Sequence, residues 1–189
     1  MTRPASAKPR IDRAAIELFV RVGVDAATTK EIAAAAGVSE GAIYRHYRSK
    51  DELALSLFMG VHRRLSSLVE EAASSAADIR AKAAAVVNVY CEVADENWLL
   101  FTYHLLSIHR FLPYYQEDGR DPVSVVENIL KRAMISAEIP PADPRVLAAM
   151  VIGVIVQTAQ NKAYGRIDSS MSAHAPLMTT AVQAILFAR

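Results

Sequence analysis

The first residues that could do chemistry are Gly37–Gly41, where the order G-V-S-E-G sets Ser39 between two glycines. This is the spacing of a nucleophile elbow, in which a serine on a sharp turn between a strand and a helix attacks a carbonyl. The protein would then be a hydrolase. The same serine can instead cap a helix by accepting a hydrogen bond from a first-turn amide. The elements that flank Ser39 decide between the two.

Cys91 and two histidines provide a second set of reactive side chains. Cys91 is the only cysteine and could pair with His104 as a thiol and imidazole. His104 and His109 are five residues apart, so they lie on different faces of a helix, and with Cys91 they make a poor metal site. We therefore expect no metal and no cofactor. A single cysteine allows no intrachain disulfide and favours a cytoplasmic location.

Helical patterns surround Ser39 on both sides. A first helix is predicted from a stripe of apolar residues that Gly23 is placed to end: Ile11, Ala14, Ala15, Leu18, Phe19 and Val22. Thr28 and Glu31 have the spacing of a capping box and begin a second helix that stops at Gly37. Because a helix rather than a strand precedes Ser39, we predict that Ser39 caps a third, short helix, "EGAIYRHY".

A long helix is predicted after this segment, with Ser49 and Glu52 again at capping-box spacing. Two short helices joined by a glycine-containing turn, with a longer helix on each side, form a helix-turn-helix. Residues 1–50 carry nine Lys or Arg against five Asp or Glu, whereas the other 139 residues carry twelve against fifteen. A basic head on a mildly acidic body suits a first segment that meets a polyanion.

The run "TTKEIAAAAGVSEGAIYRHYRSKDEL", residues 28–53, resembles the DNA-binding signature of the TetR family of transcriptional regulators. The resemblance covers about the first third of the chain. It implies phosphate contacts from Thr29, Tyr44, His46 and Lys50. It also implies positions at the DNA groove for Lys30, Ser39, Glu40, Gly41, Ala42 and Arg45. Since Gly41 and Ala42 offer almost no side-chain hydrogen bonding, direct base reading would depend mainly on Arg45 and Lys30.

Two further expectations concern the head. Tyr47 is expected to be a core aromatic of a small helical domain. The N-terminal arm with Arg3, Lys8 and Arg10 is expected to be disordered in the free protein, and the sequence leaves open whether it follows the minor groove in a complex.

The rest of the chain predicts five more helices, which makes an all-α protein of about nine helices. Asp78 is placed to cap one of them, and Asp-Pro pairs at 121–122 and 143–144 are strong helix-start signals. We predict a helix-turn-helix DNA-binding domain with a basic arm at 1–52 and a helical ligand-binding and dimerisation domain at 53–189.

The segment 144–164 is apolar on more than one face, which indicates a buried partner surface. No stretch reaches the roughly 18 uninterrupted apolar residues that a membrane span needs, so no membrane partner is expected. The resemblance implies that the last two helices pair with their copies in a four-helix bundle. Such a homodimer would require double-stranded DNA with a near-palindromic operator.

Aromatic residues and a histidine cluster between the head and this apolar segment. They could line a cavity for a small, largely apolar effector, or they could be ordinary core. The residues we expect to bind this ligand are Tyr90, Trp98, Tyr103, His104 and Phe111. The favoured function is a transcriptional repressor that an effector releases from DNA, not an enzyme. The alternatives are a small helical hydrolase using Ser39, or a helical interaction protein that does not bind DNA.

Overall fold

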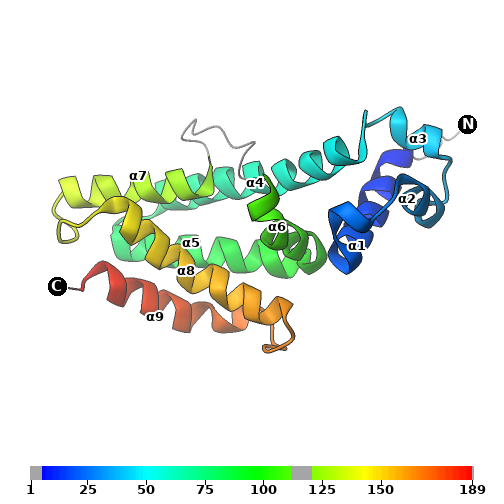
Figure 1. Cartoon of the computed structure of the whole chain (residues 1–189). Helices are drawn as coiled ribbons and strands as arrows, with labels where there is room; N and C mark the ends of the chain where they lie inside the picture. The colour runs from blue at the N-terminus through cyan, green and yellow to red at the C-terminus, as the bar shows by residue number, and fades with distance from the viewer. Residues whose placement is uncertain (1–5, 112–120, 189) are drawn as a thin grey trace, which may run out of the picture. The chain divides into compact units, whose positions relative to one another are not determined.

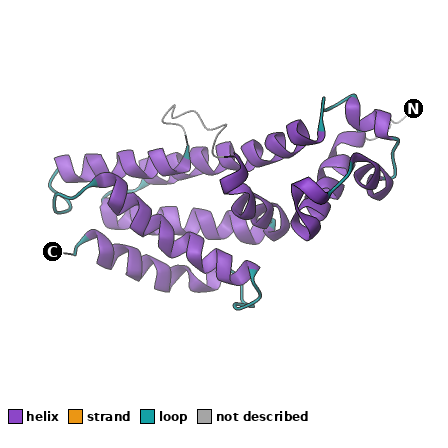
Figure 2. Cartoon of the chain, in the orientation of Figure 1, coloured by secondary structure: helices purple, strands orange, loops and turns teal. Residues whose placement is uncertain are grey.

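A computed structural model describes residues 6–111 and 121–188. Within these ranges the chain forms nine α-helices and no strand, which confirms the predicted all-α class (Figure 2). The helices are α1 (Ala7–Ala26), α2 (Thr29–Ala36), α3 (Glu40–Tyr44), α4 (Lys50–Ser75), α5 (Ile79–Glu96), α6 (Trp98–Phe111), α7 (Pro122–Ile135), α8 (Pro144–Ala163) and α9 (Ala175–Leu186). A short 3₁₀ turn, Ser172–His174, precedes α9.

The described helices form two compact units. Unit 1 comprises α1, α2, α3, α4 as far as Val61, and α6 from Leu99. Unit 2 comprises α4 from His62, then α5, α7, α8 and α9. Helix α6 follows α5 in the chain, yet its contacts are with the first helices. The domain boundary at 52/53 remains a prediction.

Local capping chemistry explains where the helices begin. At Thr28 both bonds of the predicted capping box are present: the Glu31 amide donates to the Thr28 hydroxyl at 3.2 Å, and the Thr28 amide donates to the Glu31 carboxylate at 2.9 Å. Hydrogen bonds from Thr28 hold the pKa of Glu31 below its usual value. The aspartates before α5, α7 and α8 also cap as predicted: Asp78, Asp121 and Asp143.

The capping box predicted at Ser49 is half right. The Glu52 amide donates to the Ser49 hydroxyl at 3.0 Å, as expected. The Glu52 carboxylate, however, accepts the amide of Arg48 at 2.6 Å instead of the Ser49 amide.

Helix α1 differs from its prediction in three places. Gly23 has φ 84° and kinks the helix, but helical structure resumes and reaches Ala26. Val22 is 46% exposed and does not belong to the buried stripe. Lys8 and Arg10 are helical, and Lys8 pairs with Asp12 at 2.8 Å, so the arm that was expected to be disordered belongs to α1 from Ala7 onward. Arg3 lies outside the described residues.

The core of unit 1 joins α1 to α4 with α6. Ile11, Ile32, Ile43 and Leu53 are fully buried in it, and α6 contributes Tyr103 and Phe111. Burial of such apolar surface contributes roughly 25 cal/mol per Å². The long-range packing of unit 1 therefore holds the helix-turn-helix in place.

Unit 2 is built from α5, α7, α8 and α9, which pack against one another (Figure 1). Asp95 on α5 accepts the backbone amides of Met171 and Ser172, at 2.8 and 2.9 Å, which fixes the turn before α9. Helix α8 is long and apolar enough to cross a membrane by length and composition, with 28% of its apolar window buried. Its exposed apolar residues include Val146 and Met150. As predicted, α8 is apolar on more than one face.

Candidate nucleic-acid interface

Helices α2 and α3 are joined by the turn that the sequence predicted (Figure 1). Gly37 ends α2 in the left-handed region at φ 63°, which glycine adopts at little cost. The Gly37 amide donates to Ala34 and the Val38 amide to Ala33, so the last carbonyls of α2 are satisfied. Ile32 and Ile43, one on each helix, are fully buried. The turn thus fixes α2 and α3 relative to each other, and α3 is the second helix of the helix-turn-helix.

Ser39 occupies the N-cap position of α3, but its hydroxyl makes no capping bond. The capping prediction is therefore right about the position and wrong about the hydrogen bond. The side chain is exposed, and its Oγ lies on the side of Gly41, 3.9 Å from where a Cβ on Gly41 would be. Because α2 precedes the turn, Ser39 also lacks the strand that a nucleophile elbow requires.

Most of the residues expected at DNA lie on the surface of this motif. Exposed positions are Lys30, Ser39, Glu40, Gly41, Tyr44, Arg45 and His46, while Thr29 and Lys50 are half-buried. Ala42 is only 6% exposed, so its methyl group contributes to packing and presents little surface to a groove. The exposed basic side chains of α3 and the loop after it are Arg45 and Arg48.

A polar cluster connects the start of α2 to α3. The Thr29 hydroxyl donates to the Glu40 carboxylate at 2.9 Å, and the Tyr44 hydroxyl lies 3.5 Å from the same Thr29 oxygen. The two residues expected to contact phosphate, Thr29 and Tyr44, are thus adjacent in the structure. They lie fifteen positions apart in the sequence. Nothing in the sequence indicates that Glu40 hydrogen-bonds to Thr29 beside them.

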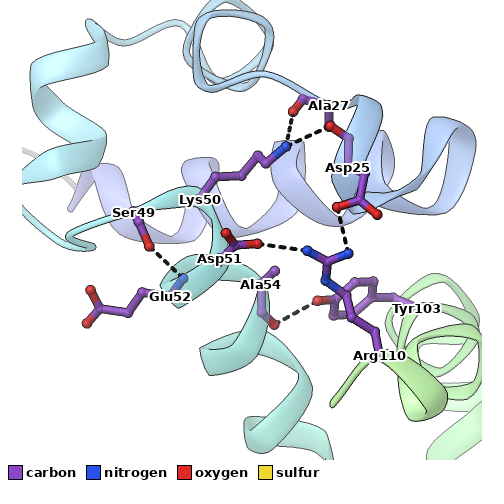
Figure 3. Close-up of polar contacts among 9 residues, drawn as sticks. All are labelled: Asp25, Ala27, Ser49, Lys50, Asp51, Glu52, Ala54, Tyr103 and Arg110. Carbon is purple, nitrogen blue, oxygen red and sulfur yellow. Dashed lines mark hydrogen bonds and ion pairs between the residues drawn. The ribbon is translucent and has the colours of Figure 1, made fainter. Parts of the chain in front are cut away.

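Lys50 is engaged within the head (Figure 3). Its ammonium group donates to the backbone carbonyls of Asp25 and Ala27, at 2.9 and 2.6 Å. These carbonyls belong to the C-terminal end of α1, where a positive charge is favourable. The expected phosphate contact of Lys50 remains a prediction, and the ammonium also fixes the end of α1.

Arg110, near the end of α6, was not anticipated from the sequence. Its guanidinium donates to Asp25 at 2.7 Å and to Asp51 at 2.9 Å, and so joins α6 to the end of α1 and the start of α4 (Figure 3). The hydrogen bond to Asp25 and then that to Asp51 raise the pKa of Arg110. The partners are 85 and 59 positions away, which no local pattern indicates.

Tyr47 is a core residue, as predicted. It is 4% exposed, and its hydroxyl donates to Asp12 on α1 at 2.6 Å. Burial and the bond to Asp12 raise the pKa of Tyr47. The ammonium of Lys8 lies 5.2 Å from the centre of the Tyr47 ring. This set fixes α1 against the residues that follow α3.

The five residues expected to bind a ligand fall in different units. Tyr103, His104 and Phe111 lie in unit 1, where the Tyr103 hydroxyl donates to the Ala54 carbonyl and His104 stacks on Phe58 with 4.7 Å between ring centres. In unit 2, Tyr90 is buried, and Trp98 has the Lys162 ammonium 5.0 Å from its ring centre. Their binding of a ligand remains a prediction.

Cys91 has the properties of a structural thiol. It is fully buried, and burial, with smaller contributions from Asp95 and Glu92, raises its pKa to about 11. At neutral pH the group is a thiol, which is a poor nucleophile. Among the described residues, no group of three or more His, Cys, Asp or Glu side chains is placed to hold a metal ion.

Comparison with known proteins matches residues 11–57 to the family model described as "Bacterial regulatory proteins, tetR family". An uncharacterised HTH-type transcriptional regulator of Bacillus subtilis, YerO, is 39% identical over 67 residues, which are 34% of this chain and 23% of YerO. The HTH-type transcriptional regulator SrpR of Pseudomonas putida is 26% identical over 147 residues, which are 70% of this chain and 63% of SrpR. The matched parts thus span less than two thirds of either relative.

Solved structures share the fold over nearly the whole chain. The fatty acid degradation regulator FadR of Bacillus halodurans has a TM-score of 0.81 at 19% identity and covers 98% of this chain and 97% of its own. FadR of Bacillus subtilis, solved in complex with stearoyl-CoA, has a TM-score of 0.73 at 20% identity, with 95% and 97% covered. With the helix-turn-helix geometry, the family match leads to one conclusion: residues 11–57 are a helix-turn-helix domain of the tetR family of bacterial regulatory proteins, in a chain whose fold is similar to those of the solved regulators.

Proposed function

We propose that this protein is a cytoplasmic transcriptional repressor that binds a near-palindromic operator as a homodimer and leaves it when a small, largely apolar effector binds. The observation that carries the proposal is the helix-turn-helix of α2 and α3, with its exposed Arg45, His46 and Lys30. Exposed cations beside a helix that fits the major groove supply both phosphate binding and base contacts.

Within this proposal the DNA contacts divide into two kinds. Thr29, Tyr44, His46 and Lys50 contact phosphates, while Lys30, Arg45 and the first turn of α3 lie at the groove. The clustered hydroxyls of Thr29 and Tyr44 support the first group, because both can reach one phosphate. Arg45 is the main reader of base identity, since arginine recognises guanine by two hydrogen bonds.

The homodimer forms through α8 and α9. These helices leave apolar side chains exposed on unit 2, among them Val146 at 56%, Met150 at 55% and Leu177 at 72%. A second copy that covers this face would bury them, and a two-fold axis would set two recognition helices one DNA turn apart, about 34–36 Å, or a multiple of it.

An apolar effector is supported by two observations. Unit 2 contains a cavity lined almost wholly by apolar residues. A protein of the same fold, FadR of Bacillus subtilis, was solved with stearoyl-CoA. The effector releases DNA only if it favours a state that fits the operator less well.

The test is footprinting of the purified protein on the DNA upstream of its own gene, because regulators of this kind often control neighbouring genes. We expect a protected, near-palindromic site of about 15 to 30 base pairs, with binding that weakens steeply with salt as counterions are released. Absence of salt-sensitive protection on fragments of this locus contradicts the proposal. Hydrolysis of a generic ester that is lost in Ser39→Ala would instead favour the enzyme alternative.

A further inference from the structure

Two adjoining cavities lie within unit 2. The first lies between α5, α7, α8 and α9 and is partly open to solvent, and each of these helices contributes a valine: Val86, Val126, Val151 and Val182. Every residue that lines it is apolar except Lys82. The second cavity lies among α4, α5 and α7 and is lined by polar groups that include Asn128 and Arg132. Lys82 and Ile129 line both cavities, so the two share a wall.

The charges that line the polar cavity favour an anion. Lys82 is half-buried and Arg132 is exposed, and neither forms an ion pair with any residue that the structure describes. Glu70 is the one carboxylate among the lining residues of the polar cavity. Two cations against one carboxylate leave an excess positive charge. Because Lys82 lines both cavities, its alkyl stem can lie on the apolar side while its ammonium group faces the polar side.

We propose that these adjoining cavities bind an amphipathic anion: an unbranched alkyl chain in the apolar cavity, with an acidic head group at Lys82, Arg132 and Asn128. This site would define the chemical class of the effector, and so it rests on the proposed function. The shared chemistry is an alkyl chain joined to an anion. A free carboxylate and a phosphate-bearing thioester of coenzyme A are the two sources to be distinguished.

The sizes of the cavities favour a linear chain. The apolar cavity has about 40 Å³ of free volume and the polar one about 160 Å³. Since about 10–15 Å³ of such volume accommodates one water, the apolar cavity admits only the first few carbons of a chain unless the helices move. A fused ring system would require the four helices to separate. The polar cavity is the roomier one, as a hydrated head group requires.

The first experiment titrates the full-length protein by calorimetry with straight-chain carboxylates from butanoate to dodecanoate, and with the matching octanoyl-CoA. We expect Kd to fall about fourfold for each added methylene until the apolar cavity is full, and then to level off. A lower Kd for octanoyl-CoA than for octanoate identifies the phosphate-bearing thioester as the source, and the reverse identifies the free acid. Affinity that does not depend on chain length overturns the proposal.

Variants of the two cations that line the polar cavity test the head-group site. Lys82→Met removes the ammonium group and keeps an apolar side chain, and Arg132→Gln removes the guanidinium. Each should raise the Kd for octanoate about tenfold, as expected for a lost charged hydrogen bond. Lys131→Gln is the matched control, because Lys131 adjoins Arg132 on α7 but lines neither cavity, and it should bind as wild type. Wild-type affinity in both Lys82→Met and Arg132→Gln contradicts the proposed site.

Filling the apolar cavity tests the site of the chain. Val86→Phe places a ring in the cavity from a half-buried position on α5 and should abolish octanoate binding. Ile152→Phe, from α8, serves the same purpose if the first variant fails to fold, as judged by circular dichroism and thermal unfolding. Val123→Phe is the control, because Val123 is exposed on α7 and lines neither cavity, and it should bind octanoate as wild type. Octanoate binding that survives in both Val86→Phe and Ile152→Phe contradicts this placement of the chain.

The outcome separates this inference from the proposed function. Operator titration is carried out without any carboxylate. A protein that binds its operator but none of these alkyl anions disproves the ligand site and leaves the regulator proposal standing. A protein that binds the alkyl anions at Lys82 but no DNA from its own locus disproves the regulator proposal alone.

Discussion

Tyr103 on α6 donates its hydroxyl to the backbone carbonyl of Ala54 on α4, at 2.7 Å and across 49 positions of sequence. Both residues are buried, with Tyr103 1% exposed. Burial raises the pKa of Tyr103, so the hydroxyl is protonated and able to donate at any pH near neutrality. Together with Arg110, this bond makes α6 part of unit 1.

The first prediction compares these two links. Tyr103→Phe should lower the free energy of unfolding by about 1 kcal/mol, because it removes a buried hydrogen bond without opening a cavity. Arg110→Gln should cost less than about 1 kcal/mol, since its partners Asp25 and Asp51 are 86% and 69% exposed and water screens them. Urea unfolding measures both, and a larger loss in Arg110→Gln than in Tyr103→Phe would contradict this ranking.

A second prediction separates phosphate contact from base reading. Lys50→Gln should weaken specific and non-specific DNA binding alike and flatten the salt slope by about one unit. It should also lower stability by about 1 kcal/mol, since two carbonyls of the α1 end lose their donor. Arg45→Ala should instead reduce discrimination between operator and random DNA. If Lys50→Gln lowers stability and leaves the salt slope unchanged, Lys50 has only a structural role.

The third prediction concerns two residues at N-cap positions. Thr28→Ala should cost about 1 kcal/mol, because the Thr28 hydroxyl accepts the Glu31 amide. Ser39→Ala should change stability by no more than about 0.5 kcal/mol, because the Ser39 hydroxyl makes no capping bond. Thermal melts of the two variants beside wild type give the comparison. Equal losses would mean that Ser39 caps α3 in solution after all.

A fourth prediction follows from His62 on α4. Burial lowers its pKa below the ordinary 6.5, Arg63 acts in the same direction, and Asp121 opposes them. The unfolded chain therefore binds more protons than the folded one just below pH 6.5. The contribution of His62 to the free energy of unfolding is fully present above pH 6.5. It is lost as the pH falls through the pKa of His62 in the folded protein, by at most about 1.4 kcal/mol per pH unit.

The measurement is urea unfolding of wild type and His62→Gln at pH 7.5, 6.5 and 5.5, at one protein concentration. The other titrating groups are common to both proteins and cancel in the difference. We expect the stability of wild type relative to the variant to decline between pH 6.5 and 5.5. A difference that does not vary with pH would show that His62 titrates alike in both states.

The last prediction addresses the dimer. Met150→Glu and Leu177→Glu place a charge on the exposed apolar face of α8 and α9, and burying an unpaired charge is costly. Each variant should sediment as a monomer where wild type sediments with twice the mass of one chain. Val22→Glu is the control, because Val22 is similarly exposed at 46% but lies on α1. A dimer that survives both changes would place the interface elsewhere.

Local signals explain what the sequence could predict. The caps at Thr28, Asp78 and Asp121, like the turn at Gly37, depend on residues within four positions of one another, and α2, α5 and α7 begin where these patterns occur. The family signature located the helix-turn-helix for the same reason, since it occupies one short run of residues. Where a hydroxyl points is not set by spacing, and so the Ser39 bond was predicted wrongly.

Distant partners explain what the sequence could not predict. Arg110 meets Asp25 only because α6 packs on α1 and α4, and a lone arginine at the end of an apolar helix does not reveal its partner. Likewise, Lys82 lines two cavities only because α5 packs among α4, α7, α8 and α9. An i, i+4 pattern shows which face of α5 is apolar. It does not show the free volume that remains where α5 packs with α7, α8 and α9.

The buried Cys91 makes this protein convenient for spectroscopy. It is the only cysteine, it is inaccessible, and its pKa of about 11 leaves almost no thiolate at pH 7 to react with a maleimide. A cysteine introduced at exposed Arg48 would then carry the only nitroxide label on each chain. Pulsed electron paramagnetic resonance between the two labels of a dimer would measure the distance between its recognition helices. No native residue would have to be removed from the core.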